Sequence, residues 1–208
     1  MATLTRDRRL PRRLTQLYVG LALFGVSMGL LVRSGLGNMP WDVLHQGLVR
    51  QLGGTIGGWS IAVGVVVLLL WIPLRERPGL GTVSNVVLIG VSVDATLAVL
   101  PDAGPVAVQV AYLGVGVLLN AFATALYVGA RLGPGPRDGL LTGFVRRTGG
   151  SVRLVKTAIE LSVVLVGWAM GGTLGVGTAV FVLTIGPLVH VFMHRLAVPA
   201  GPVATLGR

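Results

Sequence analysis

The sequence predicts an all-α membrane protein with six transmembrane helices, built as two inverted repeats of three helices each. Three observations predict this class. First, 53% of the 208 residues are hydrophobic and only 12% are charged, whereas soluble domains carry about 25% charged residues. Second, six apolar segments are long enough to cross the hydrocarbon core of a bilayer, which is about 30 Å thick. Third, the second half of the chain repeats the first.

The first apolar segment follows a basic arm over residues 1–13. It is too long for the apolar region of a signal peptide, so we expect it to remain as an uncleaved helix. The first repeat then covers residues 14–100, the second covers residues 106–195, and a tail covers residues 196–208. The predicted spans are 14–32, 56–74, 83–100, 106–128, 154–170 and 176–192.

Two shorter segments, residues 40–51 and 136–147, follow the first span of each repeat. Each begins with a proline, which is favoured in the first turn of a helix, and carries an aspartate two residues later. Neither is long enough to cross a bilayer. We expect two short half-helices that are interfacial or re-entrant.

The distribution of lysine and arginine predicts the orientation. The connections at residues 101–105 and 171–175 contain neither residue, whereas the N-terminal arm and the connections on the same side as the arm are rich in arginine. Basic loops remain in the cytoplasm during membrane insertion. We therefore expect both termini in the cytoplasm, with only Arg33 and Arg50 as basic residues on the other side.

The internal repeat appears when the chain is aligned with itself at a constant offset without gaps. Roughly a third of the positions from Leu17 to Val93 are then identical to their partners, and many of these are not the common aliphatic residues of membrane helices. The repeat motif pairs Gly37 with Gly133, Pro40 with Pro136 and Asp42 with Asp138. Each unit holds three spans, an odd number, so the copies must enter the bilayer from opposite sides.

Few ionisable residues fall inside the apolar segments or the two shorter segments. Asp42 and Asp138 occupy equivalent positions, where an acid in the first helical turn stabilises the positive end of the helix dipole. One interpretation is helix capping in two surface loops. The other places both carboxylates on a substrate or proton pathway, with Arg137 neutralising or gating one of them and Glu160 contributing from the fifth span, beside Lys156. We treat Asp42, Asp138, Arg137 and Glu160 as the candidate pathway residues.

The remaining polar and aromatic residues have simpler interpretations. Asp94 and the equivalent His190 lie toward helix ends, where we expect solvation. His190 and His194 are four residues apart, but no third ligand accompanies them and the chain has no cysteine, so we expect no metal site. Asn85 and Asn120 suit hydrogen bonds between helices, and Trp41, Trp59 and Trp71 suit interfacial anchoring. No catalytic constellation or cofactor motif is present, so we expect no enzyme, no cofactor and no nucleic-acid partner.

The glycines of the first span (Gly20, Gly25, Gly29) and the repeated motif around Pro40-Trp41-Asp42 and Pro136-Arg137-Asp138 resemble the bacterial YczE-like membrane proteins, relatives of the YitT group. The likeness covers the chain apart from the basic arm and the tail. It implies a multi-pass protein of the bacterial cytoplasmic membrane. It implies no catalytic residues.

Two hypotheses for the function follow. The inverted duplication and the paired Pro-x-Asp segments favour a small transporter or permease-like protein that moves an unknown small solute or ion. The alternative is a non-transporting scaffold or regulatory protein that acts through a membrane partner or as a homo-oligomer. The architecture alone does not separate them, because one fold serves many functions.

Overall fold

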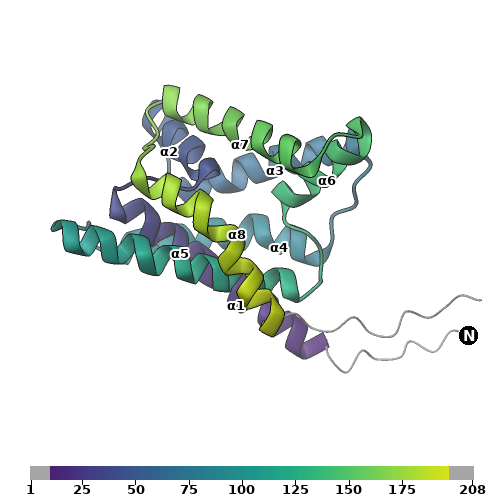
Figure 1. Ribbon diagram of the computed structural model, residues 1–208, viewed down its shortest axis with the longest axis horizontal. Coiled ribbons are helices and arrows are strands. Elements are labelled where there is room, and N and C mark those ends of the chain that lie inside the picture. Colours follow the sequence, from purple (N-terminus) through teal and green to yellow (C-terminus); the bar gives the residue numbers. More distant parts are fainter. Residues whose placement is uncertain (1–9, 197–208) are drawn as a thin grey trace, which may run out of the picture.

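Within residues 10–196, which the computed structural model describes, the chain forms eight helices and no strand (Figure 1). The predicted arm up to residue 9 and the predicted tail from residue 197 lie outside the described residues. A short helix follows the first long helix of each half, as the sequence predicts. The helices are α1 Leu10–Ser34, α2 Pro40–Leu52, α3 Ile56–Leu74, α4 Leu80–Val99, α5 Val106–Gly129, α6 Pro136–Thr148, α7 Val152–Ala169 and α8 Val176–Leu196.

Five of these helices, α1, α3, α4, α5 and α8, are long and apolar enough to cross a bilayer. The helix α7 has 18 residues, but Arg153, Lys156 and Glu160 lie in its first half. The helices α2 and α6 have 13 residues each, which is about 20 Å of helix and too short to span. The structure therefore supports five crossings, and the sixth stays a prediction.

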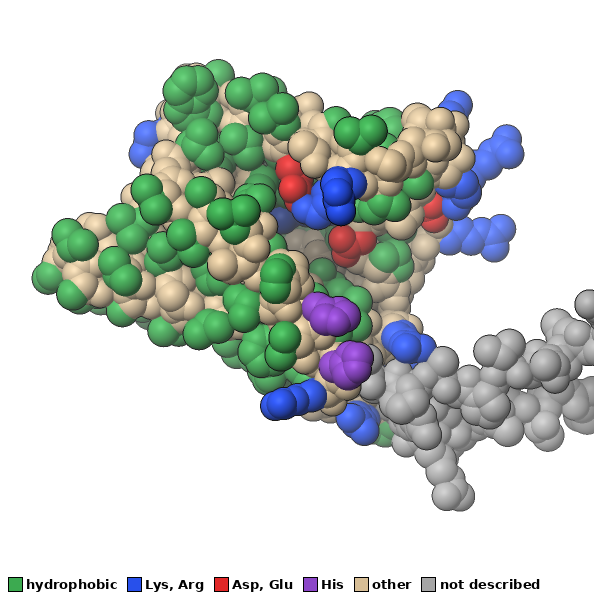
Figure 2. Space-filling view, viewed as in Figure 1, with side chains coloured by type: hydrophobic (Ala, Val, Ile, Leu, Met, Phe, Trp, Pro, Cys, Tyr) green, Lys and Arg blue, Asp and Glu red, His purple; other side chains and the backbone are tan. Residues whose placement is uncertain are grey.

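The outer faces of the long helices are apolar. Large aliphatic side chains such as Ile72 on α3 and Leu183 on α8 are more than two-thirds exposed, and green side chains cover much of the face shown in Figure 2. Apolar patches of this extent are unusual on a soluble monomer. They are the surface expected of helices that face lipid.

The two halves of the chain share their helix boundaries and their packing. Each of the helices α1 to α4 begins 96 residues before its counterpart among α5 to α8, as from Pro40 to Pro136. Equivalent hydrogen bonds join the halves, because the Gly81 amide donates to the Leu132 carbonyl at 2.8 Å and the Gly177 amide donates to the Leu36 carbonyl at 2.8 Å. Each of these loops turns at a glycine with positive φ, 129° at Gly37 and 130° at Gly133, a conformation that favours glycine.

Each half-helix packs against a long helix of the other half. The helix α2 lies on α7 and α6 lies on α3. A Cβ atom at Gly47 of α2 would lie 2.9 Å from Met170 Cβ, and one at the equivalent Gly143 of α6 would lie 3.0 Å from Leu74 Cβ. Glycine at this position therefore permits the close approach in both halves. Equivalent arginines in the last turns of α2 and α6 also make equivalent hydrogen bonds. Arg50 donates to the Gly171 carbonyl and Arg146 donates to the Leu74 carbonyl.

The helices α1 and α5 pack side by side, in the lower part of the view in Figure 1. Gly20 permits this, because a Cβ atom there would lie 2.7 Å from the Tyr127 amide nitrogen. The buried Asn120 amide of α5 donates to Ser27 Oγ of α1 at 2.9 Å. The interhelical role predicted for Asn120 is confirmed.

Candidate functional site

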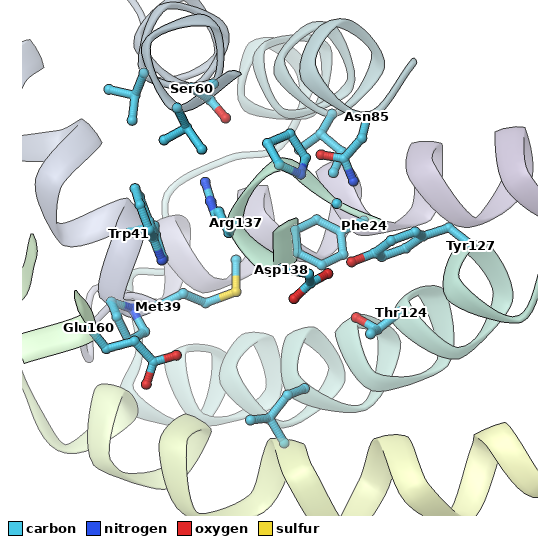
Figure 3. A pocket seen from close by; sticks show the side chains of 18 of the residues that line it. Phe24, Met39, Trp41, Ser60, Asn85, Thr124, Tyr127, Arg137, Asp138 and Glu160 are labelled. Carbon is cyan, nitrogen blue, oxygen red and sulfur yellow. The ribbon is translucent and has the colours of Figure 1, made fainter. Parts of the chain in front are cut away.

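The N-termini of the two half-helices α2 and α6 meet at a cavity of about 340 Å³ (Figure 3). Pro40 and Trp41 reach it from α2, and Pro136 and Arg137 reach it from α6. Both helices turn their positive dipole ends toward the cavity. The polar side chains that line the cavity come from the helices α3 to α7. They are Ser60, Asn85, Thr124, Tyr127, Arg137, Asp138, Lys156 and Glu160.

Arg137 and Trp41 occupy equivalent positions in the two halves and lie against each other. The Arg137 guanidinium carbon is 4.9 Å from the centre of the Trp41 ring, within the range of a cation–π interaction. No group among the described residues accepts a hydrogen bond from Arg137. Trp41 is 9% exposed, so the prediction that it anchors the protein at the membrane interface is wrong. It is held inside by the packing of α2 on α7.

Asp138 lies beside Arg137 in the chain and faces the cavity (Figure 3). A Cβ atom added at Gly135 would have three polar atoms within 4 Å, namely Asp138 Oδ2, the Tyr127 hydroxyl and the Asn85 amide nitrogen. The neutral Tyr127 and Asn85 therefore lie near this carboxylate, together with the charged Arg137 and Lys156. Asn85 lines the cavity instead of bonding another helix in the way predicted for it, because α4 turns it toward α6.

Asp42 has a different environment from its repeat counterpart Asp138. It is fully buried, does not line the cavity and makes no capping hydrogen bond, so its interpretation as a cap in a surface loop is wrong. Its Oδ1 atom is 3.1 Å from Nδ1 of the equally buried His45. Asp42 Oδ2 and His45 Nε2 have no hydrogen-bond partner among the described residues. Sequence reasoning missed His45, although its position three residues after Asp42 places both on one helix face.

Glu160 and Lys156 form the predicted ion pair on α7. The Glu160 side chain is 28% exposed and that of Lys156 is 53% exposed, and both line the cavity. The cavity therefore brings three of the four candidate pathway residues together, Arg137, Asp138 and Glu160. The fourth, Asp42, lies behind Trp41 in α2.

The cavity opens between α7 and α8, where the two halves of the molecule differ. The helix α3 packs along α4, whereas α7 and α8 touch at no more than isolated points. Figure 2 shows the resulting hollow, with acidic and basic side chains at its mouth. A ligand entering through this gap would pass the Lys156–Glu160 pair.

Glycines explain why α3 and α4 pack closely in the first half while α7 and α8 do not in the second. A Cβ atom at Gly90 of α4 would lie 2.7 Å from the Gly57 carbonyl oxygen of α3, and one at Gly64 would lie 3.1 Å from a Val86 methyl carbon. In the second half, Arg153 and Glu160 stand at the positions of Gly57 and Gly64. The counterpart of Gly90 is Gly186, whose Cβ position has no atom within 4 Å.

Polar contacts close the first half further. Asp94 of α4 accepts hydrogen bonds from Thr55 Oγ1 at 2.6 Å and from the Gly57 amide at 2.8 Å. Asp94 is half-buried, and its carboxylate also satisfies free donors at the start of α3. Its counterpart His190 is exposed and lies near His194, with 5.8 Å between the ring centres and the rings tilted by 53°. Among the described residues, no group of three potential metal ligands occurs.

The other two tryptophans differ in environment. Trp71 is 1% exposed and its indole N–H donates to the Pro136 carbonyl at 3.0 Å, so its predicted anchoring role is wrong. It supports the start of α6, where the cavity lies. Trp59 is half-buried and donates to the Gly53 carbonyl at 2.8 Å.

Comparisons with known proteins identify relatives over most of the chain. A model described as a family of unknown function (DUF6198) matches residues 11–194. An uncharacterized protein of Haemophilus influenzae is 39% identical over 181 residues, covering 87% of this chain and 83% of that protein. The uncharacterized membrane protein YczE of Bacillus subtilis is 34% identical over 177 residues, covering 84% of this chain and 82% of YczE. No solved structure matches the chain.

The relatives and the fold agree. A membrane protein among the relatives and five helices able to cross a bilayer make this chain a multi-pass membrane protein. The resemblance to YczE-like proteins, predicted from the Pro-x-Asp motif, is confirmed. The chain belongs to the DUF6198 family of unknown function, together with the YczE-like membrane proteins.

Proposed function

We propose that the protein is a small transporter of the bacterial cytoplasmic membrane, with six crossings in two inverted repeats and both termini in the cytoplasm. The observation that carries the proposal is the difference between the two halves around one cavity. The helices α3 and α4 are closed while α7 and α8 are open, although both pairs derive from the same repeated unit.

This asymmetry has a natural place in transport. In inverted-repeat transporters the halves exchange conformations, so that the site faces each side of the membrane in turn. Applied to this chain, exchange would bring Thr157 and Gly186 together as Ile61 and Gly90 are now, and would separate α3 from α4. Opposite insertion of the halves would then move the opening of the cavity from one side of the membrane to the other.

The cavity residues have distinct roles in this proposal. Asp138, which faces the cavity near Tyr127 and Asn85, is the group that binds a proton or a cation. Arg137 offsets its charge, which lowers the electrostatic cost of ionised groups at membrane depth. Glu160 and Lys156 line the gap that opens and closes. Asp42 and His45 form a buried acid–base pair in α2, outside the cavity lining.

Disulfide trapping tests the exchange without knowledge of the substrate, because the natural chain has no cysteine. The Gly64→Cys/Val86→Cys pair has a Cβ to Cβ distance of 3.6 Å, which suits a disulfide. It should cross-link α3 to α4 rapidly on oxidation. The Thr157→Cys/Gly186→Cys pair should also cross-link, in the fraction of molecules that reaches the exchanged state. Single-cysteine variants control for disulfides between molecules.

The scaffold hypothesis predicts a different result. A static protein would form the Gly64→Cys/Val86→Cys bond and never the Thr157→Cys/Gly186→Cys bond, which would overturn the exchange. A proteoliposome assay of candidate solutes then compares wild type with Asp42→Asn and Asp138→Asn. Transport predicts a flux that both changes abolish, and the scaffold hypothesis predicts no flux for any solute.

A further inference from the structure

We infer that the cavity binds an organic anion, a carboxylate or phosphate carried on an apolar body, with its charged group at Arg137. The inference rests on the proposed function only in using the same cavity, because binding requires no exchange of conformations. It names the chemical class of ligand that the transporter would move.

The hydrogen-bonding groups of the cavity carry the first step. Glu160 pairs with Lys156 and Asp42 pairs with His45, while Asp138 lies near Tyr127 and Asn85. Arg137 lies on the face of the Trp41 ring, and the charges of Asp42, Asp138 and Glu160 attract it. A guanidinium offers five N–H donors in a planar fork, and none of them meets an acceptor among the described residues. The N–H donors of Arg137 are therefore free to bind an acceptor on a ligand.

The helix geometry also favours an anionic ligand. Arg137 is the second residue of α6, and Trp41, against which it stacks, is the second residue of α2. Two 13-residue helices thus direct the positive ends of their dipoles at the place where the guanidinium lies. Helix N-termini bind carboxylates and phosphates well, and a planar guanidinium binds either group through two parallel hydrogen bonds.

The remaining walls of the cavity are apolar. Phe24, Ile89, Phe181, Ile185 and Val189 line it opposite the charged groups. A volume of about 340 Å³ is at the small end of ligand sites, which range over about 300–1,000 Å³. A compact body such as one aromatic ring or a short alkyl chain fits this space, with the anionic group toward Arg137. The gap between α7 and α8 gives it a way in.

A set of three ligands that share one ring tests the inference. The probes are 4-bromobenzoate, the neutral 4-bromobenzamide and the cationic 4-bromobenzylamine, each measured by quenching of tryptophan fluorescence in phosphatidylcholine nanodiscs. The bromine quenches an indole on contact, so Trp41 reports occupancy and Trp41→Phe should remove the saturable signal. We expect 4-bromobenzoate to bind at least tenfold more tightly than the other two.

Variants of one helix locate the binding group. Arg137→Gln should weaken binding of 4-bromobenzoate by roughly tenfold or more, because a charged hydrogen-bond partner is lost. Arg147→Gln is the matched control, since Arg147 lies on the exposed end of the same helix and donates to the Pro73 carbonyl. It should bind as wild type does. Thermal unfolding of each variant confirms that the fold is retained.

Competition by lipids shows whether the natural anion is a lipid headgroup or a soluble organic acid. Competition by phosphatidylglycerol, and not by phosphatidylcholine, would identify a lipid headgroup as the natural anion, whereas unchanged binding would identify a soluble organic acid. Equal affinity for the three probes, or an Arg137→Gln variant that binds as tightly as wild type, would overturn the inference. A failure here leaves the cross-linking result of Thr157→Cys/Gly186→Cys untouched, so the two proposals fail separately.

Discussion

At the scale of single residues, the two halves keep a common framework and differ in the side chains that carry chemistry. The turn glycines Gly37 and Gly133 have the same φ, because each loop needs the same backbone path. Four residues further along, the two halves differ. Trp41 stands in the first half and Arg137 in the second, and the two side chains contact each other. Unlike residues at a shared position create a stacked pair, where two arginines would repel each other. Divergence at the centre therefore makes one site from two copies.

The buried pair of Asp42 and His45 gives the first prediction. His45→Leu, which introduces the residue found at the equivalent position 141, leaves a buried carboxylate without its partner and should lower the free energy of unfolding by about 3–5 kcal/mol. Adding Asp42→Asn should recover about 1–3 kcal/mol of that loss. Unfolding in mixed micelles measures both values. Strictly additive effects of the two changes would show that the pair does not interact.

The contact between Gly139 and Trp71 gives the second prediction. A Cβ atom at Gly139 would lie 2.6 Å from Trp71 Cε2, so Gly139→Ala must displace the ring that donates to the Pro136 carbonyl. We expect a loss of about 1–3 kcal/mol and a shift in tryptophan emission. Gly114→Ala is the control, because nothing lies within 4 Å of its Cβ position. Equal stability of the two variants would contradict the packing described for α6.

At the scale of helices, glycine decides which pairs close. The helices α3 and α4 approach through Gly57 and Gly90, whereas Arg153 stands in place of the first of these on α7. Small residues permit close packing of membrane helices. Arg153, Lys156 and Glu160 are also the charged residues that distinguish α7 from the five helices apolar enough to cross a bilayer.

Gly90 and Gly186 share one repeat position and give the third prediction. Gly90→Ala places a methyl group against Ile61 and the Gly57 carbonyl and should destabilise the protein by about 1–3 kcal/mol. Gly186→Ala meets open space and should change stability by less than about 0.5 kcal/mol. Thermal or chemical unfolding of the two variants checks the difference. If Gly186→Ala proved as damaging as Gly90→Ala, α7 and α8 would be packed and the cavity closed.

The helix boundaries were accessible from the sequence, and the helix contacts were not. Starts predicted at residues 40, 56, 106, 136 and 176 coincide with observed helix starts, because proline, glycine and charge interrupt the apolar runs there. Membrane helices are apolar on nearly every side, so periodicity does not reveal which face packs. Burial of Trp41 and Trp71, and the Asp42–His45 pair, depends on α2 and α6 packing across the two halves, a contact that no local pattern encodes.

At the scale of the whole molecule, the two halves share one arrangement of helices. The cavity opens where they differ, in the gap between α7 and α8. Equivalent hydrogen bonds between the halves, Gly81 to Leu132 and Gly177 to Leu36, tie each loop to the last helix of the other half. Each half-helix packs mainly against a long helix of the other half, α2 against α7 and α6 against α3. The cavity therefore belongs to both repeats, and its two sides would face opposite leaflets if the halves are inserted in opposite directions.

Opposite insertion requires that α7 cross the membrane, and this is the fourth prediction. Single cysteines introduced into the cysteine-free chain at Pro78, Gly104, Gly150 and Thr173 sample the connections between α3 and α4, α4 and α5, α6 and α7, and α7 and α8. A membrane-impermeant maleimide reports which of them are outside intact cells. Labelling after permeabilisation is the control for each position.

This labelling pattern is the most direct test of the inverted architecture on which the transport proposal depends. We predict that Gly104→Cys and Thr173→Cys react in intact cells, while Pro78→Cys and Gly150→Cys react only after permeabilisation. Reaction of Gly150→Cys and Thr173→Cys from the same side would show that α7 does not cross, and would contradict the account.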